Sequence, residues 1–136
     1  MLELIEEMIK TDGVLPLEQV RSVFECQGIV PEDMPSVKRI LTARGSVQVS
    51  ATEEGAAITT QTLKMEYQIL YAADTETEEV MCFTVESTQT LGLNIPQTLE
   101  NGRISMTAFV EHTDFTLEGD RKITLRSVVR AEPKLF

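Results

Sequence analysis

The chain has 136 residues and a formal net charge of −10, from 12 Lys+Arg against 22 Asp+Glu. This length suits one domain with its own core, which needs no metal or disulfide to fold. The 42% apolar content is that of a globular protein rather than a disordered one. The excess of acids counts against nucleic-acid binding, because phosphate contacts require a surplus of Lys and Arg. An aromatic content of 5% disfavours a stacking site for sugars or single strands.

The N-terminal third predicts two short helices and one strand. Residues 1–10 place apolar side chains at helical spacing opposite glutamates, so we expect an amphipathic helix and linker over residues 1–16, ahead of a single β domain over residues 17–136. Residues 20–30 alternate between apolar and polar, which predicts a strand. Pro35 then opens a segment in which Val37, Ile40 and Leu41 recur at helical spacing before Gly45, which predicts a second short helix.

After Gly45 the alternation predicts antiparallel strands joined by turns. Residues 74–79 predict an acidic loop, residues 91–100 an irregular segment and Asn101-Gly102 a turn. The apolar residues that share one face of the strand at 62–71 are Leu63, Met65, Tyr67, Ile69 and Tyr71. The predicted fold class is therefore all-β, a mostly antiparallel sandwich or barrel-like fold with one or two short helices in the N-terminal third.

The last two strands predict a hairpin with a defined register. A two-residue loop at Glu118-Gly119 sets Glu111 opposite Arg126 and Phe109 opposite Val128. The same register sets His112 opposite Leu125. Both faces are then chemically coherent, and Glu111 and Arg126 form an ion pair.

Four residues on one face of the last strand are candidates for binding a partner: Lys122, Arg126, Val128 and Arg130. One interpretation is a basic recognition strip for an acidic partner. The other is pairing with acids on neighbouring strands, which the expected Glu111–Arg126 pair favours. Both interpretations stay open at this point.

The other chemistry-bearing residues favour a structural interpretation. His112 and Asp114 share a strand face, but a metal site or a His–Asp base needs a further ligand or a nucleophile, so a histidine packed near a strand end beside Leu125 is the simpler expectation. The acidic loop lacks the spacing of a calcium loop. Cys26 and Cys82 match no zinc or redox motif and are expected to be free, buried thiols. We therefore predict no catalytic, metal-binding or cofactor-binding residues, no cofactor and no enzymatic activity.

The location is predicted from missing signals. The N-terminus has neither the basic nor the apolar region of a secretory signal, and no apolar run reaches the ~18 residues of a membrane helix. We expect a cytoplasmic protein that binds neither membranes nor nucleic acid.

Three segments carry a family resemblance. They are Pro31–Leu41 with the following strand Gly45–Ser50, then Met65–Asp74, and finally Ala108–Asp114 with Arg121–Arg126. In their order and spacing they resemble the SPOCS domain family of spore-forming bacteria, over residues 17–132. The resemblance implies an interaction module of spore-coat morphogenesis, found in other proteins in tandem or beside a LysM domain, with coat and morphogenetic proteins as partners. It also implies assembly at the forespore surface from the mother-cell cytoplasm. One copy and no LysM-like segment are present here, so a stand-alone member and a piece of a longer protein both remain open.

The predicted function is a non-enzymatic interaction and assembly module of the bacterial spore envelope. Such modules act through repeated modest contacts, so we expect a homo-oligomer and specifically a symmetric dimer. The alternative is a β domain that binds a small ligand or a glycan. A hydrolase that uses His112 and Asp114 is a third hypothesis.

Overall fold

The computed structural model describes residues 15–16, 19–54, 58–94 and 104–135. The predicted N-terminal helix and the Asn101-Gly102 turn lie outside these ranges. The described residues form strands and no helix. The strands are β1 (Leu15–Pro16), β2 (Val20–Ile29), β3 (Val37–Glu54), β4 (Ile58–Ala73), β5 (Val80–Asn94), β6 (Ile104–Glu118) and β7 (Lys122–Leu135).

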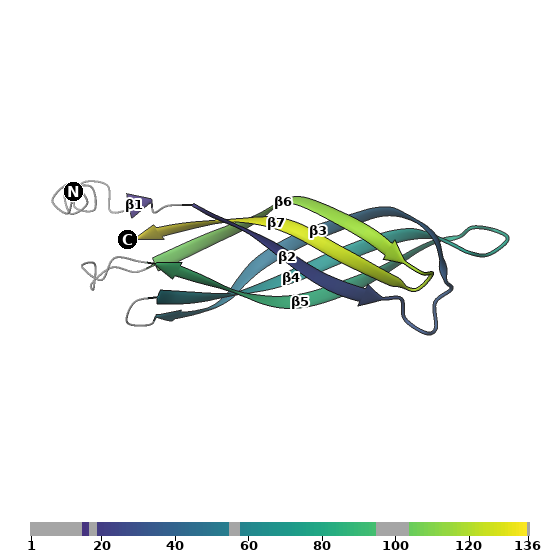
Figure 1. Ribbon diagram of the computed structural model, residues 1–136, viewed down its shortest axis with the longest axis horizontal. Helices are drawn as coiled ribbons and strands as arrows, with labels where there is room; N and C mark the ends of the chain where they lie inside the picture. The colour runs from purple at the N-terminus through teal and green to yellow at the C-terminus, as the bar shows by residue number, and fades with distance from the viewer. Residues whose placement is uncertain (1–14, 17–18, 55–57, 95–103, 136) are drawn as a thin grey trace.

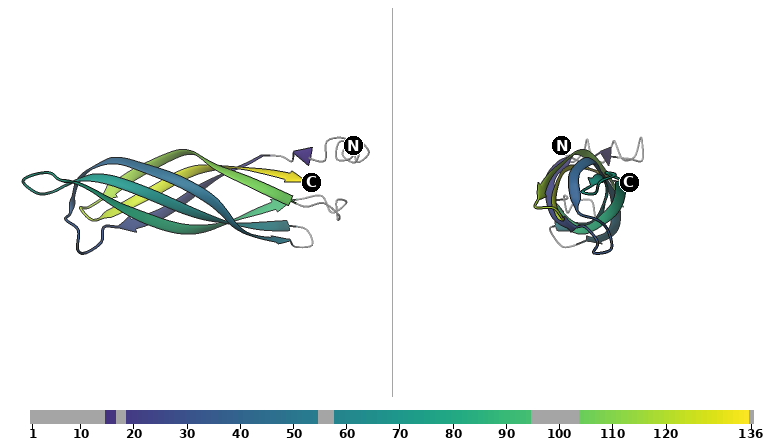
Figure 2. Two further views of the ribbon diagram at one scale, coloured as in Figure 1. Left: turned by 180° about the vertical axis from the view of Figure 1, so that it is seen from behind. Right: turned by 90° about the vertical axis from the view of Figure 1, so that its right-hand side faces the viewer.

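The strands form two antiparallel sheets that pack face to face. In sheet A, β7 lies in the middle, with β6 on one side and β1 and β2 on the other. Sheet B has the order β3-β4-β5. The long strands coil around each other, so that the molecule is elongated (Figure 1) and round when seen from its end (Figure 2). The prediction of an all-β fold with a sandwich of antiparallel strands is confirmed.

The core lies between the two central strands. The five β4 side chains that the alternation placed on one face, from Leu63 to Tyr71, are each at most 1% exposed. From sheet A they meet Ile123, Leu125, Val129 and Ala131 of β7. The rings of Tyr71 and Phe83 pack edge to face with centroids 5.8 Å apart. Full burial of one large apolar side chain is worth about 1.5–3 kcal/mol, so this layer supplies most of the driving force for folding.

The helix expected after Pro35 is wrong, because Val37 opens strand β3. The register between β3 and β4 shifts between Val37 and Arg39 and again between Ile40 and Thr42. Each irregularity adds a residue and changes which side chain points inward. The inward positions Val37 and Ile40 are therefore three residues apart, and this spacing imitates a helix. Pairing with β4 decides the structure of this segment, as tertiary contacts commonly override local propensity.

The predicted hairpin register is also wrong. The loop between β6 and β7 has three residues, since Glu118 pairs with Lys122, and Gly119 adopts a positive φ of 74°. A further irregularity lies between Val110 and His112. The three-residue loop sets His112 opposite Val128 and Asp114 opposite Arg126, and the irregularity then sets Phe109 opposite Arg130. Glu111 sits at the irregularity and pairs with other arginines, so the expected Glu111–Arg126 ion pair does not form.

The loops at one end of the sandwich are organised around Arg121. Its guanidinium donates to the carbonyl oxygens of Val30, Pro31 and Met34, at 3.3, 2.6 and 3.0 Å. The Val30 amide donates back to the Arg121 carbonyl at 2.8 Å. The Tyr71 hydroxyl donates to the carbonyl of Pro35 at 2.7 Å. These contacts fix the loop between β2 and β3 against β4 and the loop that precedes β7.

The two long sides of the sandwich are closed to different degrees. On one side β3 packs along β6, and a Cβ at Gly45 would lie 3.0 Å from both the Tyr67 ring and the Thr113 hydroxyl. On the other side β2 approaches β5 at Gly28, where a Cβ would lie 2.6 Å from a methyl group of Val85. At both positions a Cβ would crowd neighbouring side chains, more severely at Gly28 than at Gly45, so glycine fits there without displacing them.

Three smaller expectations also have outcomes. Residues 91–94 belong to β5, so the segment expected to be irregular begins as a strand. Both cysteines are free, but Cys82 is exposed and Cys26 half-buried, so the expectation of two buried thiols is wrong for Cys82. In the described part of the chain, the structure contains no helix with the length and apolarity of a membrane span.

Candidate functional site

The four candidate residues lie at alternate positions on β7, at the centre of sheet A. Lys122, Arg126, Val128 and Arg130 all point away from the core, since the residues between them are the core side chains of the strand. β7 pairs with β2 along one edge and with β6 along the other, so each candidate residue has one cross-strand neighbour on β2 and one on β6. We call the surface made by these three strands the outer face of sheet A.

Two of the three basic candidates already have acidic partners within the chain. Lys122 lies 3.5 Å from Glu118. Arg130 lies 3.4 Å from Glu111 and 3.1 Å from Glu132. Arg21 on β2 reaches the same Glu111 at 2.9 Å. Lys122 and Arg130 therefore pair with acids within the chain, as the interpretation of intramolecular pairing expected, whereas Glu111 pairs with Arg21 and Arg130 instead of Arg126.

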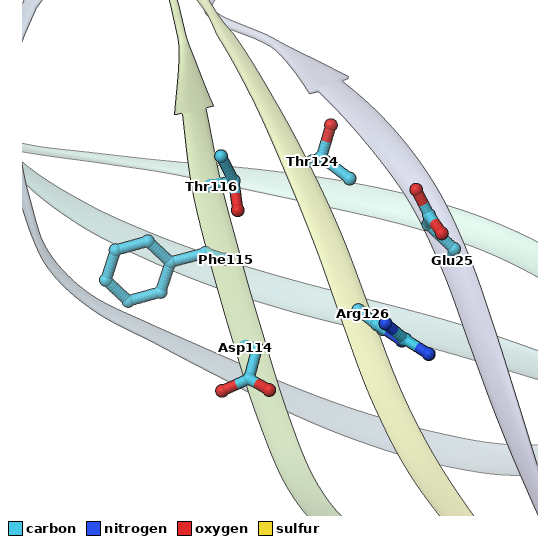
Figure 3. A pocket seen from close by; sticks show the side chains of 6 residues that line it. All are labelled: Glu25, Asp114, Phe115, Thr116, Thr124 and Arg126. Atoms are coloured by element: carbon cyan, nitrogen blue, oxygen red, sulfur yellow. The ribbon is translucent and has the colours of Figure 1, made fainter.

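Arg126 stands between two carboxylates in the register. Glu25 of β2 pairs with it on one side and Asp114 of β6 on the other. Figure 3 shows the Arg126 side chain extending toward β2 on the same side of the sheet as Glu25. The row is acidic, basic, acidic, which is the arrangement that cross-strand neighbours favour.

An apolar strip runs beside these charges. Val23 of β2 is 53% exposed and lies opposite Val128. Phe109 of β6 is 40% exposed, and the guanidinium of Arg130 lies 4.9 Å above its ring centre, as in a cation–π contact. Aromatic and arginine side chains are the types that concentrate in the centres of protein interfaces.

The outer face of sheet A carries no net charge. Its five basic side chains are Arg21, Lys122, Arg126, Arg130 and Lys134, and its five acidic ones are Glu25, Glu111, Asp114, Glu118 and Glu132. Removing 5 bases and 5 acids from the whole chain leaves 7 bases and 17 acids, so the net charge of −10 belongs to the other surfaces. The basic residues of β7 are therefore matched by an equal number of acids on the same face of the sheet.

A shallow depression of about 420 Å³ lies at one end of this face. It is lined by Glu25, Asp114, Phe115, Thr116, Thr124 and Arg126 (Figure 3). The Thr124 hydroxyl is buried there and finds no hydrogen-bond partner among the described residues. The ring of Phe115 points off β6, away from β7. The depression is therefore polar where β7 forms its floor.

His112 and Asp114 contact each other, but among the described residues they do not belong to a larger group of metal-ligating side chains. Nε2 of His112 lies 2.7 Å from the Asp114 carboxylate, and both side chains are about two-thirds exposed, at 65% and 68%. The expected packing of His112 beside Leu125 is wrong, because the three-residue hairpin loop sets it opposite Val128 on the outer face. Among the described residues, no group of three or more His, Cys, Asp or Glu side chains is placed to hold a metal ion.

The interior holds a small hydroxyl cluster of its own. The Tyr67 hydroxyl lies 2.8 Å from that of Ser127, which lies 3.1 Å from that of Thr113. Burial raises the pKa of Tyr67, and it raises the pKa of the nearby Cys26 thiol. Both groups stay protonated at neutral pH, so this cluster joins the two sheets by hydrogen bonds and supplies no activated nucleophile.

Sequence reasoning missed the flanking half of the outer face. Phe109 was expected opposite Val128 and lies opposite Arg130, which is the contact that stacks the guanidinium on the ring. Val23 was visible only as an outward position in the alternating pattern of residues 20–30. Its place beside Val128 depends on the pairing of β2 with β7, which no local pattern encodes.

The fold and this face define a class: an all-β sandwich of two antiparallel sheets with a neutral, partly apolar outer face. When the chain is compared with known proteins, no family model, no curated protein sequence and no solved structure matches it.

Proposed function

We propose that the protein is a non-enzymatic interaction module that binds protein partners through the outer face of sheet A. The observation that carries this proposal is an apolar strip made of exposed Val23 and Phe109 with half-buried Val128 beside them, bordered by paired charges on a surface with no net charge. Protein interfaces combine an apolar centre containing aromatic and arginine side chains with a polar rim.

The charge arrangement supports a protein partner more than a polyanion or a polycation. A surface that binds a strongly charged partner carries an excess of one sign. Here each arginine at the centre has an acidic neighbour, so a partner gains little from a single sign of charge. A partner with its own apolar patch and mixed polar rim fits best.

The spore envelope remains a prediction that the family resemblance alone carries. Under that prediction the partners are coat or morphogenetic proteins, and the domain acts in the mother-cell cytoplasm and at the forespore surface. The resemblance also defines where to look for a partner, namely in sporulating cells.

The test compares pairs of matched substitutions. Tagged protein captures partners from a lysate of sporulating cells, and a purified partner is then titrated by calorimetry. Phe109→Ala and Val23→Lys are expected to weaken that binding at least about tenfold, because truncating a central interface residue commonly costs more than 1 kcal/mol.

The controls carry similar changes elsewhere. Phe115 is 41% exposed on the same strand but points off its edge, and Leu70 is 36% exposed on sheet B. Phe115→Ala and Leu70→Lys are expected to bind as the unchanged protein does. Equal loss in all four variants, or no loss in any, contradicts the proposal.

A second candidate function rests on the depression beside Arg126. Its volume of about 420 Å³ is sufficient for a small polar ligand, and the Thr124 hydroxyl offers an unused hydrogen-bonding group. Most ligand sites are more apolar and enclosed than this one. A thermal-shift screen with cortex sugars and small polar metabolites tests it, because a ligand that binds the folded state raises the melting temperature, and Thr124→Val removes the response.

A further inference from the structure

The second edge of β5 is a long run of unpaired backbone. Within the described residues, β5 pairs with β4 and with no other strand. Its register with β4 runs without a break from Ala72↔Val80 to Ile58↔Asn94. The amides and carbonyls that point outward from such an edge can donate and accept hydrogen bonds to one added strand.

The other edges of the two sheets are protected in ways that β5 is not. The register of β3 is interrupted and the strand faces β6, while β6 is interrupted at Glu111. β2 is shorter and carries Arg21 and Glu25 on its outward side. β5 has 15 residues, no proline, no irregularity and a single charged residue, Glu86. Charges, breaks and short length are the usual means by which edge strands avoid pairing with other chains.

The accessible part of this edge is its C-terminal half. β2 approaches β5 at Gly28 and Val85, and the Cys26 side chain of β2 reaches Ser87, so this contact closes the side of the sandwich as far as the Ser87 side chain. Beyond Glu86 the segment Ser87–Asn94 is free of charge. Thr88 and Thr90 are exposed on its outer face, and threonine pairs across strands favourably.

We propose that two copies of the chain associate through β5, antiparallel and about a two-fold axis within Ser87–Asn94, so that two copies of sheet B join into one continuous sheet. A partner strand here must be extended and uncharged. A second β5 meets both requirements, and an antiparallel pair of identical strands is related by the two-fold axis of a symmetric dimer. The axis within Ser87–Asn94 keeps Glu86 of each copy away from the centre of the contact.

This association goes beyond the proposed function, because β5 belongs to sheet B and the partner-binding face belongs to sheet A. The two surfaces can therefore be tested separately. The segment Ser87–Asn94 is uncharged, so the residues outside it carry the full net charge of −10. Two copies of the chain therefore repel each other electrostatically. Salt screens this repulsion, and dimerisation is expected to strengthen between 20 and 300 mM salt, roughly from a Debye length of 20 Å to one of 6 Å.

The experiment measures the dimer dissociation constant by sedimentation equilibrium. The unchanged chain is expected to dimerise. Thr88→Lys together with Thr90→Lys places like charges opposite each other across the two-fold axis and is expected to raise the dissociation constant at least about tenfold. The matched control is Gln48→Lys with Gln68→Lys, which adds the same charge to exposed positions on β3 and β4 of the same sheet and is expected to leave the dissociation constant within about twofold.

A charge-complementation arm identifies the contact. A chain with Thr88→Glu and Thr90→Glu is also expected to be monomeric, and mixing it with the lysine chain is expected to restore a dimer that contains one of each. Far-UV circular dichroism confirms that each variant is folded. If the unchanged chain is monomeric, the proposal is wrong. This result is expected, for example, where another segment of the same chain covers the edge of β5. Dimers that persist unchanged in both charged variants overturn it as well.

Discussion

The two long sides of the sandwich solve the same packing problem with different results. On the β3/β6 side, Gly45 lets the Tyr67 ring and Thr113 meet, and the hydroxyl cluster with Ser127 ties both sheets together. On the β2/β5 side, Gly28 allows a close approach to Val85, and among the described strands β5 pairs only with β4. One side is tied by packing and hydrogen bonds between the sheets, and the other leaves the β5 edge through which we propose that two copies associate.

The largest expected effect on the free energy of unfolding comes from truncating a buried side chain on the β3/β6 side. Tyr67→Ala removes a fully buried ring and is expected to lower the free energy of unfolding by about 3–5 kcal/mol. Phe24→Ala on β2 removes a half-buried ring of the open side and is expected to cost about half as much. Urea unfolding of both variants measures the difference. Equal losses contradict the distinction between the two sides.

The next effect concerns the two glycines at the close approaches. Gly28→Ala and Gly45→Ala are each expected to cost about 1–3 kcal/mol through overpacking. At Gly28 the obstacle is one valine methyl group, so Val85→Ala in the same chain is expected to recover part of the loss. At Gly45 the Tyr67 ring remains in the way, and Thr113→Ala is expected to recover little. A double-mutant cycle from thermal unfolding checks both statements, and equal recovery at the two sites disagrees with them.

A smaller effect appears at alkaline pH. Burial raises the pKa of Tyr67 and of Tyr71 above the ordinary value of 10.0. A folded state with a raised pKa holds its proton more tightly, so the stabilisation is complete below pH 10 and is lost as the pH rises through the folded-state pKa. Tyr67→Phe is expected to cost about 0.5–1.5 kcal/mol at neutral pH and to flatten the fall above pH 10. Unfolding curves from pH 7 to 11 measure this, and an unchanged slope in the variant would falsify the role of Tyr67.

The smallest effect concerns the charges at the irregularity in β6. Glu111 lies near both Arg21 and Arg130, and Glu111→Gln is expected to cost about 0.2–1 kcal/mol, less at high salt. Glu25→Gln is the matched control, because Glu25 forms no ion pair among the described residues. Chemical unfolding at 20 and 500 mM salt separates the two variants. A loss that does not depend on salt argues against an electrostatic cause.

The alternation of apolar residues was enough to predict the β4 core, β2, the acidic loop and the all-β class. It failed where strands are interrupted, since the irregularity between Val37 and Arg39 in β3 spaced Val37 and Ile40 like a helix. It failed at the β6–β7 loop because a glycine with positive φ allows loops of two or three residues, and the choice here accompanies the docking of the Arg121 carbonyl on Val30.

The candidate site was predictable along one strand and not across the sheet. The alternation correctly gave Lys122, Arg126, Val128 and Arg130 one face. The apolar neighbours Val23 and Phe109 and the neutralising acids come from other strands. An error of three residues in the hairpin register at His112, reduced to two at Phe109 by the irregularity between Val110 and His112, was enough to assign the wrong partners to both and to Glu111.

The most direct test of the contrast between the two sides is amide hydrogen exchange, resolved by residue and measured at several protein concentrations. We expect strong protection throughout β4 and β7 at every concentration, and protection of residues 87–92 in β5 that increases as the protein is concentrated. Amides of β3 and β6 on the closed side are expected to be independent of concentration. Exchange in β5 that does not change with concentration, or that changes equally in β3 and β6, would contradict an open side that serves for association.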